Sequence, residues 1–222
     1  MPGRERAETP MFPLGTVLLP DGAIPLHVFE ERYRALTRRC VDGGEPFGVA
    51  LIERGSEVGG GDVRTDVATL ATIVEHEEFP DGRWALIAVG TERVVVEEWL
   101  PDDPYPRALV TSWPDEDQTI GPETRAEAIR RIRRVIAMAA EAGYRVAGID
   151  VDAAVEGLDD SAFSHRLAGS VPVGPLDRQR LLCAAGPSDR LRVLDDVLDG
   201  VETLMMAAIQ SGGNADGEGA EG

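Results

Sequence analysis

The chain's three histidines are the first side chains to weigh for metal binding or acid–base chemistry. His27, His76 and His165 fall on three different expected elements, and none of them stands in an HExxH spacing. His76 is followed by Glu77 and Glu78, but side chains alternate along a strand, so His76 and Glu77 point to opposite faces. The sequence therefore predicts no metal site.

Serine and cysteine residues do not stand in the spacings of known nucleophiles. A nucleophile elbow needs G-x-S-x-G, whereas Ser56 and Ser170 each directly follow a glycine. Cys40 and Cys183 are far apart in the sequence and form no CxxC pattern, so neither a disulfide framework nor a thiolate metal site is expected. The sequence thus supports neither a hydrolase triad nor cysteine chemistry.

The chain contains no lysine. Its 22 arginines account for the whole Lys+Arg count. A Walker-type phosphate loop needs a lysine at the phosphates, and a Ser-Lys protease dyad needs one as the base, so the sequence excludes both. We therefore expect no catalytic residue and no cofactor. Among 40 acidic residues, a carboxylate pair that performs acid–base catalysis stays open as a rival hypothesis.

The net charge of the chain is −18, which argues against binding to phosphate backbones or anionic lipids. The only concentrated positive charge is a run of arginines, which are Arg125, Arg130, Arg131, Arg133 and Arg134. The run is typical of a solvated helix face that pairs with nearby acids. A contact with an acidic partner or a phosphate, through Arg130 and Arg134, is the alternative.

The elements that must position these residues change in class along the chain. From residue 11 to about 115, short apolar runs separated by turn residues predict a small closed β structure, interrupted by one helix from about Val28 to Val41. On that helix Phe29, Tyr33, Leu36 and Cys40 share one face. The expected strands are Phe12 to Leu19, Phe47 to Glu53, Val67 to Glu75, Trp84 to Val89, Arg93 to Trp99 and Arg107 to Trp113.

Helical periodicity follows and persists to about residue 211. Gly186-Pro187 breaks the chain before the last helix, and Ser188 is placed to cap it. The expected helices span about 123–142, 150–157, 160–169, 176–185 and 188–211.

The resulting organisation is a disordered start at 1–10, a β subdomain at 11–117, a helical subdomain at 118–211 and a disordered acidic tail at 212–222. No stretch reads as a signal peptide, and none approaches the about 18 apolar residues of a membrane span. We expect a cytoplasmic protein without membrane contact, and the sequence predicts no oligomeric state.

Two linked motifs open the chain, FPLGTVLLP at 12–20 and IPLHVFEERYR at 24–34. They are followed in order by FGV at 47–49, ATLATI at 68–73, DGR at 81–83, GTER at 90–93, LDRQRLL at 176–182 and DRL at 189–191. This series resembles the amino-terminal domain of Lon proteases over about residues 11–205. Leu19, Ala68 and Cys183 depart from the family's usual residues.

The resemblance implies an α+β fold, in which a PUA-like β-barrel of about six strands with one helix is followed by a C-terminal α-helical bundle. It further implies a non-catalytic binding module, standing alone without ATPase or protease parts, whose partner is an unfolded polypeptide or another protein. An apolar groove between barrel and bundle is the expected binding surface. Pro25, Leu26, Phe29 and Tyr33, with Glu30 and Arg32, match the opening motif, and they either fix the helix against the barrel or contact the partner. The alternative is a PUA-like RNA-binding module, which the charge makes unlikely.

Overall fold

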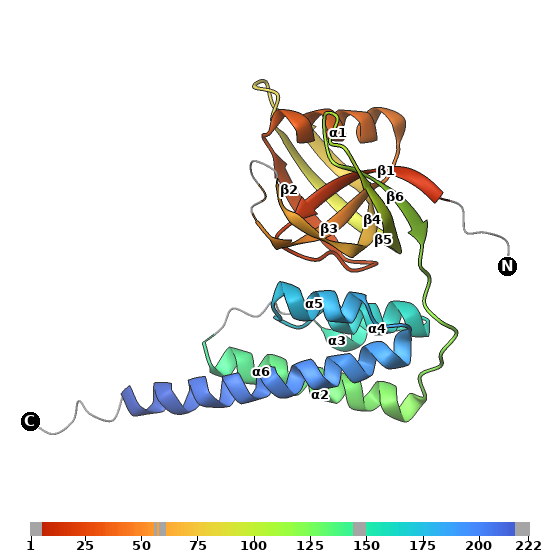
Figure 1. Cartoon of the computed structure of the whole chain (residues 1–222). Coiled ribbons are helices and arrows are strands. Elements are labelled where there is room, and N and C mark those ends of the chain that lie inside the picture. Colours follow the sequence, from red (N-terminus) through yellow and green to blue (C-terminus); the bar gives the residue numbers. More distant parts are fainter. Residues whose placement is uncertain (1–5, 56, 58–60, 144–149, 216–222) are drawn as a thin grey trace, which may run out of the picture. The chain divides into compact units, whose positions relative to one another are not determined.

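The computed structural model describes residues 6–55, 57, 61–143 and 150–215, and it divides the chain into two compact units, Met1–Pro114 and Asp115–Gly222. The change of unit falls after Pro114 and not after the predicted residue 117. The first unit carries all the described strands and the second unit carries helices (Figure 1). The predicted α+β class is confirmed.

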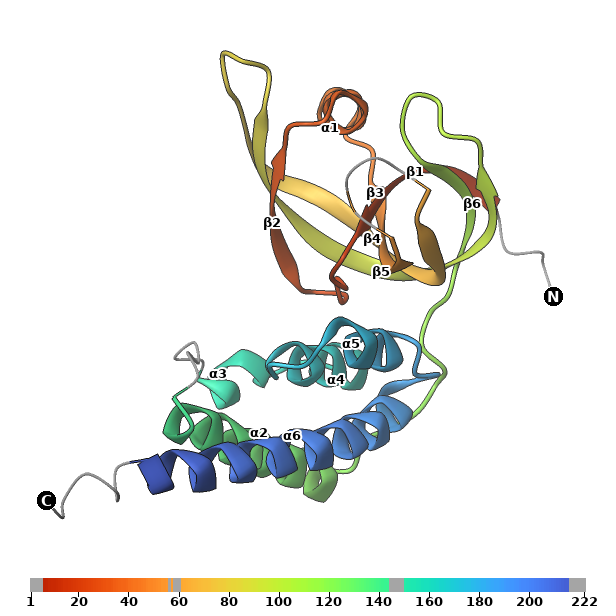
Figure 2. The same cartoon turned by 60° about the vertical axis from the view of Figure 1, so that its left-hand side comes forward.

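The first unit is one mixed sheet of six strands with a helix, α1 (Glu31–Gly43), packed on it. The strand order is β2-β5-β4-β3-β1-β6; β1 and β3 run parallel and the other neighbours antiparallel. The sheet curls strongly, so that β6 pairs with β5 as well as with β1 (Figure 2). The strands are β1 (Arg6–Leu14), β2 (Ala23–Val28), β3 (Phe47–Arg54), β4 (Val63–Glu78), β5 (Trp84–Leu100) and β6 (Arg107–Ser112).

The first strand corrects two predictions about the start of the chain. Residues 6–10, predicted to be disordered, form the first part of β1 and pair with residues 107–111 of β6. The strand then ends at Leu14, whereas the prediction continued it to Leu19. Val17, Leu18 and Leu19 are buried without being part of a strand, so an apolar run was mistaken for continued strand.

Two other strands differ from the sequence prediction. β2 was missed, because its Pro25 and its short length weaken the strand pattern. Two predicted strands, Trp84 to Val89 and Arg93 to Trp99, are one continuous β5. Gly90, which lies between the two predicted strands, is at a register shift of the β4–β5 ladder, where a Cβ atom would come within 2.4 Å of the Leu19 carbonyl oxygen.

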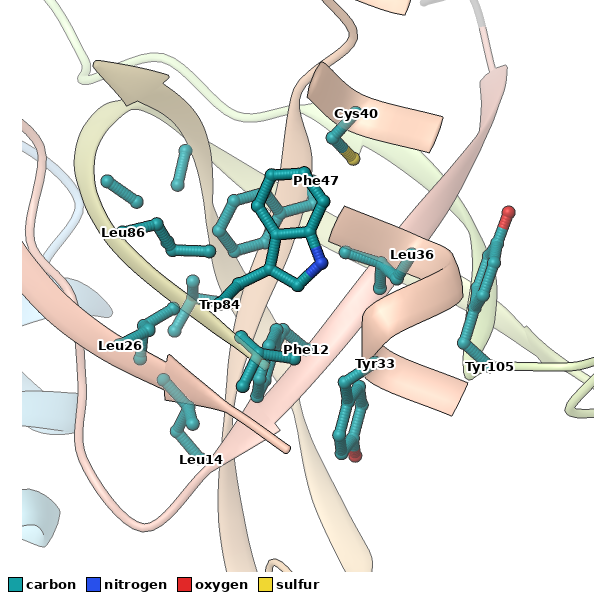
Figure 3. Close-up of a cluster of buried hydrophobic side chains, with 14 of the residues drawn as sticks. Phe12, Leu14, Leu26, Tyr33, Leu36, Cys40, Phe47, Trp84, Leu86 and Tyr105 are labelled. Carbon is teal, nitrogen blue, oxygen red and sulfur yellow. The ribbon is translucent and has the colours of Figure 1, made fainter. Parts of the chain in front are cut away.

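The main core of the first unit lies between α1 and the sheet. Tyr33, Leu36 and Cys40 of α1 are buried against it. The rings of Phe12 and Tyr33 stack with centroids 4.2 Å apart, and Phe47 packs beside Phe12 (Figure 3). The helix ends where Gly44 adopts a left-handed conformation with φ of 64°.

The predicted helix start at Val28 is wrong, because β2 continues to Val28 and α1 begins at Glu31. Phe29 lies in the connection, and its side chain is 58% exposed, so it does not share the buried face of Tyr33. Around this helix start, Glu30 pairs with Arg32, and Arg34 pairs with Glu31.

The second unit is a set of helices built around α6, which is also its longest described helix (Figure 1). Leu191, Leu194, Leu198, Val201 and Met205 of α6 are buried, as their spacing of three and four residues predicts. α6 extends to Ala215, so the predicted tail at 212 begins too early; residues 216–222 lie outside the described part. The helices are α2 (Pro122–Glu141), α3 (Val151–Val155), α4 (Asp160–Gly169), α5 (Pro175–Leu182) and α6 (Pro187–Ala215).

The start of α6 is capped by a residue from another segment. The backbone N–H groups of Ser188 and Asp189 donate to Gln118 Oε1 at 3.1 and 3.2 Å. The Ser188 hydroxyl instead donates to the Thr119 carbonyl at 2.9 Å, so the prediction that Ser188 caps the helix is wrong. A glutamine from the distant connection between β6 and α2 thus replaces a local cap and ties that connection to the helix.

Candidate functional site

The first unit contains an apolar groove of about 450 Å³, here called the β2 groove. Its volume lies within the range of about 300–1,000 Å³ that is usual for binding pockets. It is lined by Phe12, Leu14, Thr16, Ile24, Pro25, Leu26, His27, Val28, Phe29, Glu30, Tyr33 and Glu57.

Three elements supply the walls of the β2 groove. Phe12 and Leu14 come from the end of β1, and Tyr33 comes from the first turn of α1. β2 contributes every residue from Ile24 to Val28, and Phe29 follows it directly. The groove is therefore held by the same Phe12–Tyr33 stack that anchors α1, so its apolar floor is part of the core.

Charges at the groove are carried by two carboxylates, Glu30 and Glu57, and none of the residues that line it is an arginine. Arg32 is not among the lining residues, but its Nε donates to the Glu30 carboxylate at 3.1 Å and its Nη2 donates to the Glu57 carbonyl at 3.1 Å. The guanidinium of Arg32 also lies 4.5 Å from the centre of the Tyr33 ring. Burial raises the pKa of Tyr33 to about 12, so its hydroxyl is neutral at physiological pH.

The structure brings four of the six predicted contact residues together, since Pro25, Leu26, Phe29 and Tyr33 all line the β2 groove. They differ in exposure. Tyr33 and Leu26 are buried in the core, whereas Pro25 and Phe29 are exposed. Tyr33 and Leu26 are thus placed to support the fold, while Pro25 and Phe29 remain accessible at the groove.

The other two predicted residues, Arg130 and Arg134, lie on α2 in the second unit. Arg130 pairs with Glu127 on its own helix, and Arg134 donates to Glu202 of α6 at 2.8 Å. Their neighbour Arg131 also pairs with Glu202. These arginines therefore pair with nearby acids, which is the solvated-helix reading of the cluster.

Thr16, Ile24 and Glu57 are among the groove residues that sequence reasoning did not single out as contacts. Ile24 could have been found from the alternation around Pro25 if that stretch had been read as an edge strand. Glu57 carries no such signal, because it reaches the groove from a loop, where it accepts the backbone N–H of Gly15.

The chemistry-bearing residues weighed from the sequence are dispersed. Among the described residues, no three His, Cys, Asp or Glu side chains are grouped so that they could hold a metal ion. The His76 ring lies 5.8 Å from that of Trp84. Burial raises the pKa of the Cys40 thiol to about 11, which disfavours the thiolate. In the described part of the chain, no helix combines the length and apolar character that a membrane crossing needs.

Comparison with known proteins identifies a family with a similar sequence. The model of the ATP-dependent protease La (LON) substrate-binding domain matches residues 8–199. A Lon protease 2 from Herpetosiphon aurantiacus is 28% identical over 197 residues, which are 86% of this chain and 23% of that protein. The chain thus spans under a quarter of the length of this relative.

Solved structures of similar domains share the fold. A Lon N-terminal domain protein from Xanthomonas campestris is 28% identical, with a TM-score of 0.63 over 85% of this chain and 96% of that one. The N-terminal domain of a Mycobacterium avium complex Lon protease is 16% identical, with a TM-score of 0.60 over 87% of this chain and 98% of that one. With a family model that covers most of its length, the chain belongs to the family of Lon substrate-binding domains.

Proposed function

We propose that this chain is a non-catalytic module that binds unfolded polypeptides or apolar segments of partner proteins in the β2 groove. The observation that carries the proposal is Phe29, a large apolar side chain that is 58% exposed at the edge of an apolar groove. The match to a substrate-binding domain family agrees with it.

The exposure of Phe29 is best explained by a partner. Tyr33 and Leu36 complete the contact of α1 with the sheet, so the core does not need Phe29. Full burial of a phenylalanine contributes about 1.5–3 kcal/mol, and because Phe29 is 58% exposed, a bound apolar segment would recover roughly half of this. Aromatic side chains beside a pocket are typical anchors of protein interfaces.

The RNA-binding alternative gains no support from the groove. A phosphate backbone needs arginine or lysine contacts, whereas this groove is lined by two carboxylates in a chain of net charge −18. Polypeptides carry apolar side chains that fit its floor.

The test is replacement of Phe29 by alanine. Binding of a fluorescently labelled, permanently unfolded model protein should weaken about tenfold, because a hot-spot aromatic contributes about 1–2 kcal/mol or more. Fluorescence anisotropy measures the dissociation constant. Thermal unfolding should be unchanged, since the side chain is exposed.

Val74→Ala is the matched control. Val74 is 56% exposed on β4 and does not line the groove, so its removal should leave binding unchanged. Equal loss of affinity in both variants would indicate nonspecific stickiness, and no loss with Phe29→Ala would contradict the proposed site.

A further inference from the structure

We propose that the β2 groove takes its polypeptide as an added β-strand, hydrogen-bonded along the outer edge of β2 and centred on His27, with apolar and basic side chains preferred. This proposal rests on the proposed function and adds the mode of binding and the chemistry of the bound segment.

The first argument is the position of β2 at the end of the strand order, next to β5 (Figure 2). Side chains of successive strand residues point to opposite faces, so a pocket under one face would be lined by every second residue. The β2 groove is lined by every residue from Ile24 to Phe29. It therefore runs along the backbone edge of β2, where an extended chain would lie.

The second argument is the direction of the backbone hydrogen bonds. The Gly90 N–H donates to the Gly22 carbonyl at 2.9 Å, and the β2–β5 register continues without a shift from Ala23 opposite Val89. In an antiparallel ladder the N–H and C=O of alternate residues point to the same neighbour. The backbone groups of Ile24, Leu26 and Val28 thus bond to β5. The backbone groups of Ala23, Pro25 and His27 face away from β5, toward the free edge.

Pro25 fits this assignment, because a residue without an N–H is tolerated where that N–H would face away from the sheet. It also restricts the free edge. Pro25 offers only its carbonyl, whereas His27 offers both an N–H donor and a C=O acceptor. An incoming strand therefore finds a complete hydrogen-bonding pair at His27, and Pro25 limits how far pairing extends, as prolines do at protected edges.

The third argument is the polarity of the side chains that line the groove on either side of this edge. Phe12, Leu14 and Tyr33 form an apolar floor for alternate side chains of an added strand, and Phe29 can cover them. Glu30 and Glu57 supply the charged groups among the lining residues. Arg32 pairs with Glu30 at 3.1 Å and offsets that charge, whereas its bond to Glu57 goes to the backbone carbonyl and not to the carboxylate. A segment in which apolar residues alternate with arginine or lysine complements this surface.

The main test compares His27→Pro with His27→Ala in the whole chain. The probe is a labelled peptide of about six residues, a usual strand length, that alternates valine with arginine. Proline removes only the outward N–H and keeps the bonds to β5, so the peptide should bind about tenfold more weakly. Alanine also removes the imidazole but keeps the N–H, so the tenfold loss is measured against His27→Ala, and any loss that both variants share reports the side chain.

Two further measurements keep the proposal testable if His27→Pro unfolds. Pro25→Ala adds an outward N–H and should tighten binding of the same peptide. On the unchanged chain, two peptides are compared, one N-methylated at its odd residues and the other at its even residues. Only one of them should bind, since only one edge of the peptide faces β2.

The outcomes separate this proposal from the function on which it rests. If Phe29→Ala weakens binding while His27→Pro equals His27→Ala and both methylation phases bind alike, the groove binds polypeptide but strand addition is wrong. If Phe29→Ala changes nothing, the proposed function itself fails. Equal binding of a valine–glutamate peptide would overturn the preference for basic side chains.

Discussion

At the scale of single residues, the chain separates side chains that build the fold from those that stay exposed at the groove. Tyr33 and Phe12 stack inside the first unit, while Phe29, four residues before Tyr33, stays in water. The resemblance placed Phe29 and Tyr33 in one motif. It could not divide their roles, because the division depends on α1 beginning at Glu31, after Phe29.

In the second unit, a buried arginine connects several helices through its hydrogen bonds. Arg190 is fully buried, and its two terminal nitrogens donate to the Asp115 carboxylate at 3.0 and 2.6 Å. It also donates to Ser164 at 2.7 Å and to the Leu181 carbonyl at 3.2 Å. One side chain thus joins the first residue of the unit to α4, α5 and α6.

Replacement of Arg190 by alanine should lower the free energy of unfolding of this unit by about 3–5 kcal/mol, because the buried Asp115 carboxylate loses its bidentate partner. Urea denaturation followed by circular dichroism measures the change. Arg192→Ala is the control: Arg192 pairs with Asp189 at the surface, and its loss should cost less than about 1 kcal/mol. Similar losses in both variants would contradict the account of the Arg190 network.

At the scale of elements, α2 and α6 are held together by ion pairs as well as by apolar packing. Arg131 pairs with Asp195 at 2.9 Å and with Glu202 at 3.3 Å, and Arg134 pairs with Glu202 at 2.8 Å. Burial raises the pKa of Glu202, but the hydrogen bonds from Arg134 and Arg131 lower it by more. The net pKa lies below its ordinary value of 4.5.

A carboxylate with a lowered pKa in the folded state stabilises the fold above its unfolded pKa, and this contribution is lost as the pH falls through the folded value. We therefore expect Glu202→Gln to be less stable than the unchanged chain at pH 7, and the difference should shrink below pH 4.5. Urea midpoints across this pH range measure it. Asp196→Asn, on an exposed position of α6, is the control; a Glu202→Gln difference that persists unchanged at low pH would contradict the ion-pair account.

Elements were predictable where one local pattern governs them. The helix expected at about 123–142 corresponds to α2, and the DGR motif at 81–83 lies at the turn between β4 and β5. β2 was not predictable in this way, because Pro25 weakens the pattern and its partner β5 lies about 60 residues away in sequence. Gln118 as the cap of α6 is equally a tertiary contact that local spacing does not encode.

At the scale of the whole molecule, the acidic charge and the absence of lysine restrict what the chain can bind and catalyse. A net charge of −18 disfavours nucleic acid and favours basic polypeptide segments. The motif residues that line the β2 groove were identified, but the sequence prediction placed the groove between the two subdomains, and the arrangement along a strand edge was not predicted. That arrangement depends on β2 lying beside β5, which only the fold determines.

The most direct test of the central claim is amide hydrogen exchange across the whole chain, with and without a saturating unfolded polypeptide. Binding in the β2 groove predicts slowed exchange over residues 23–29, above all at the His27 N–H, and no change over α2. Slowed exchange confined to α2 around Arg130 and Arg134, or no protection of β2 at saturation, would contradict it.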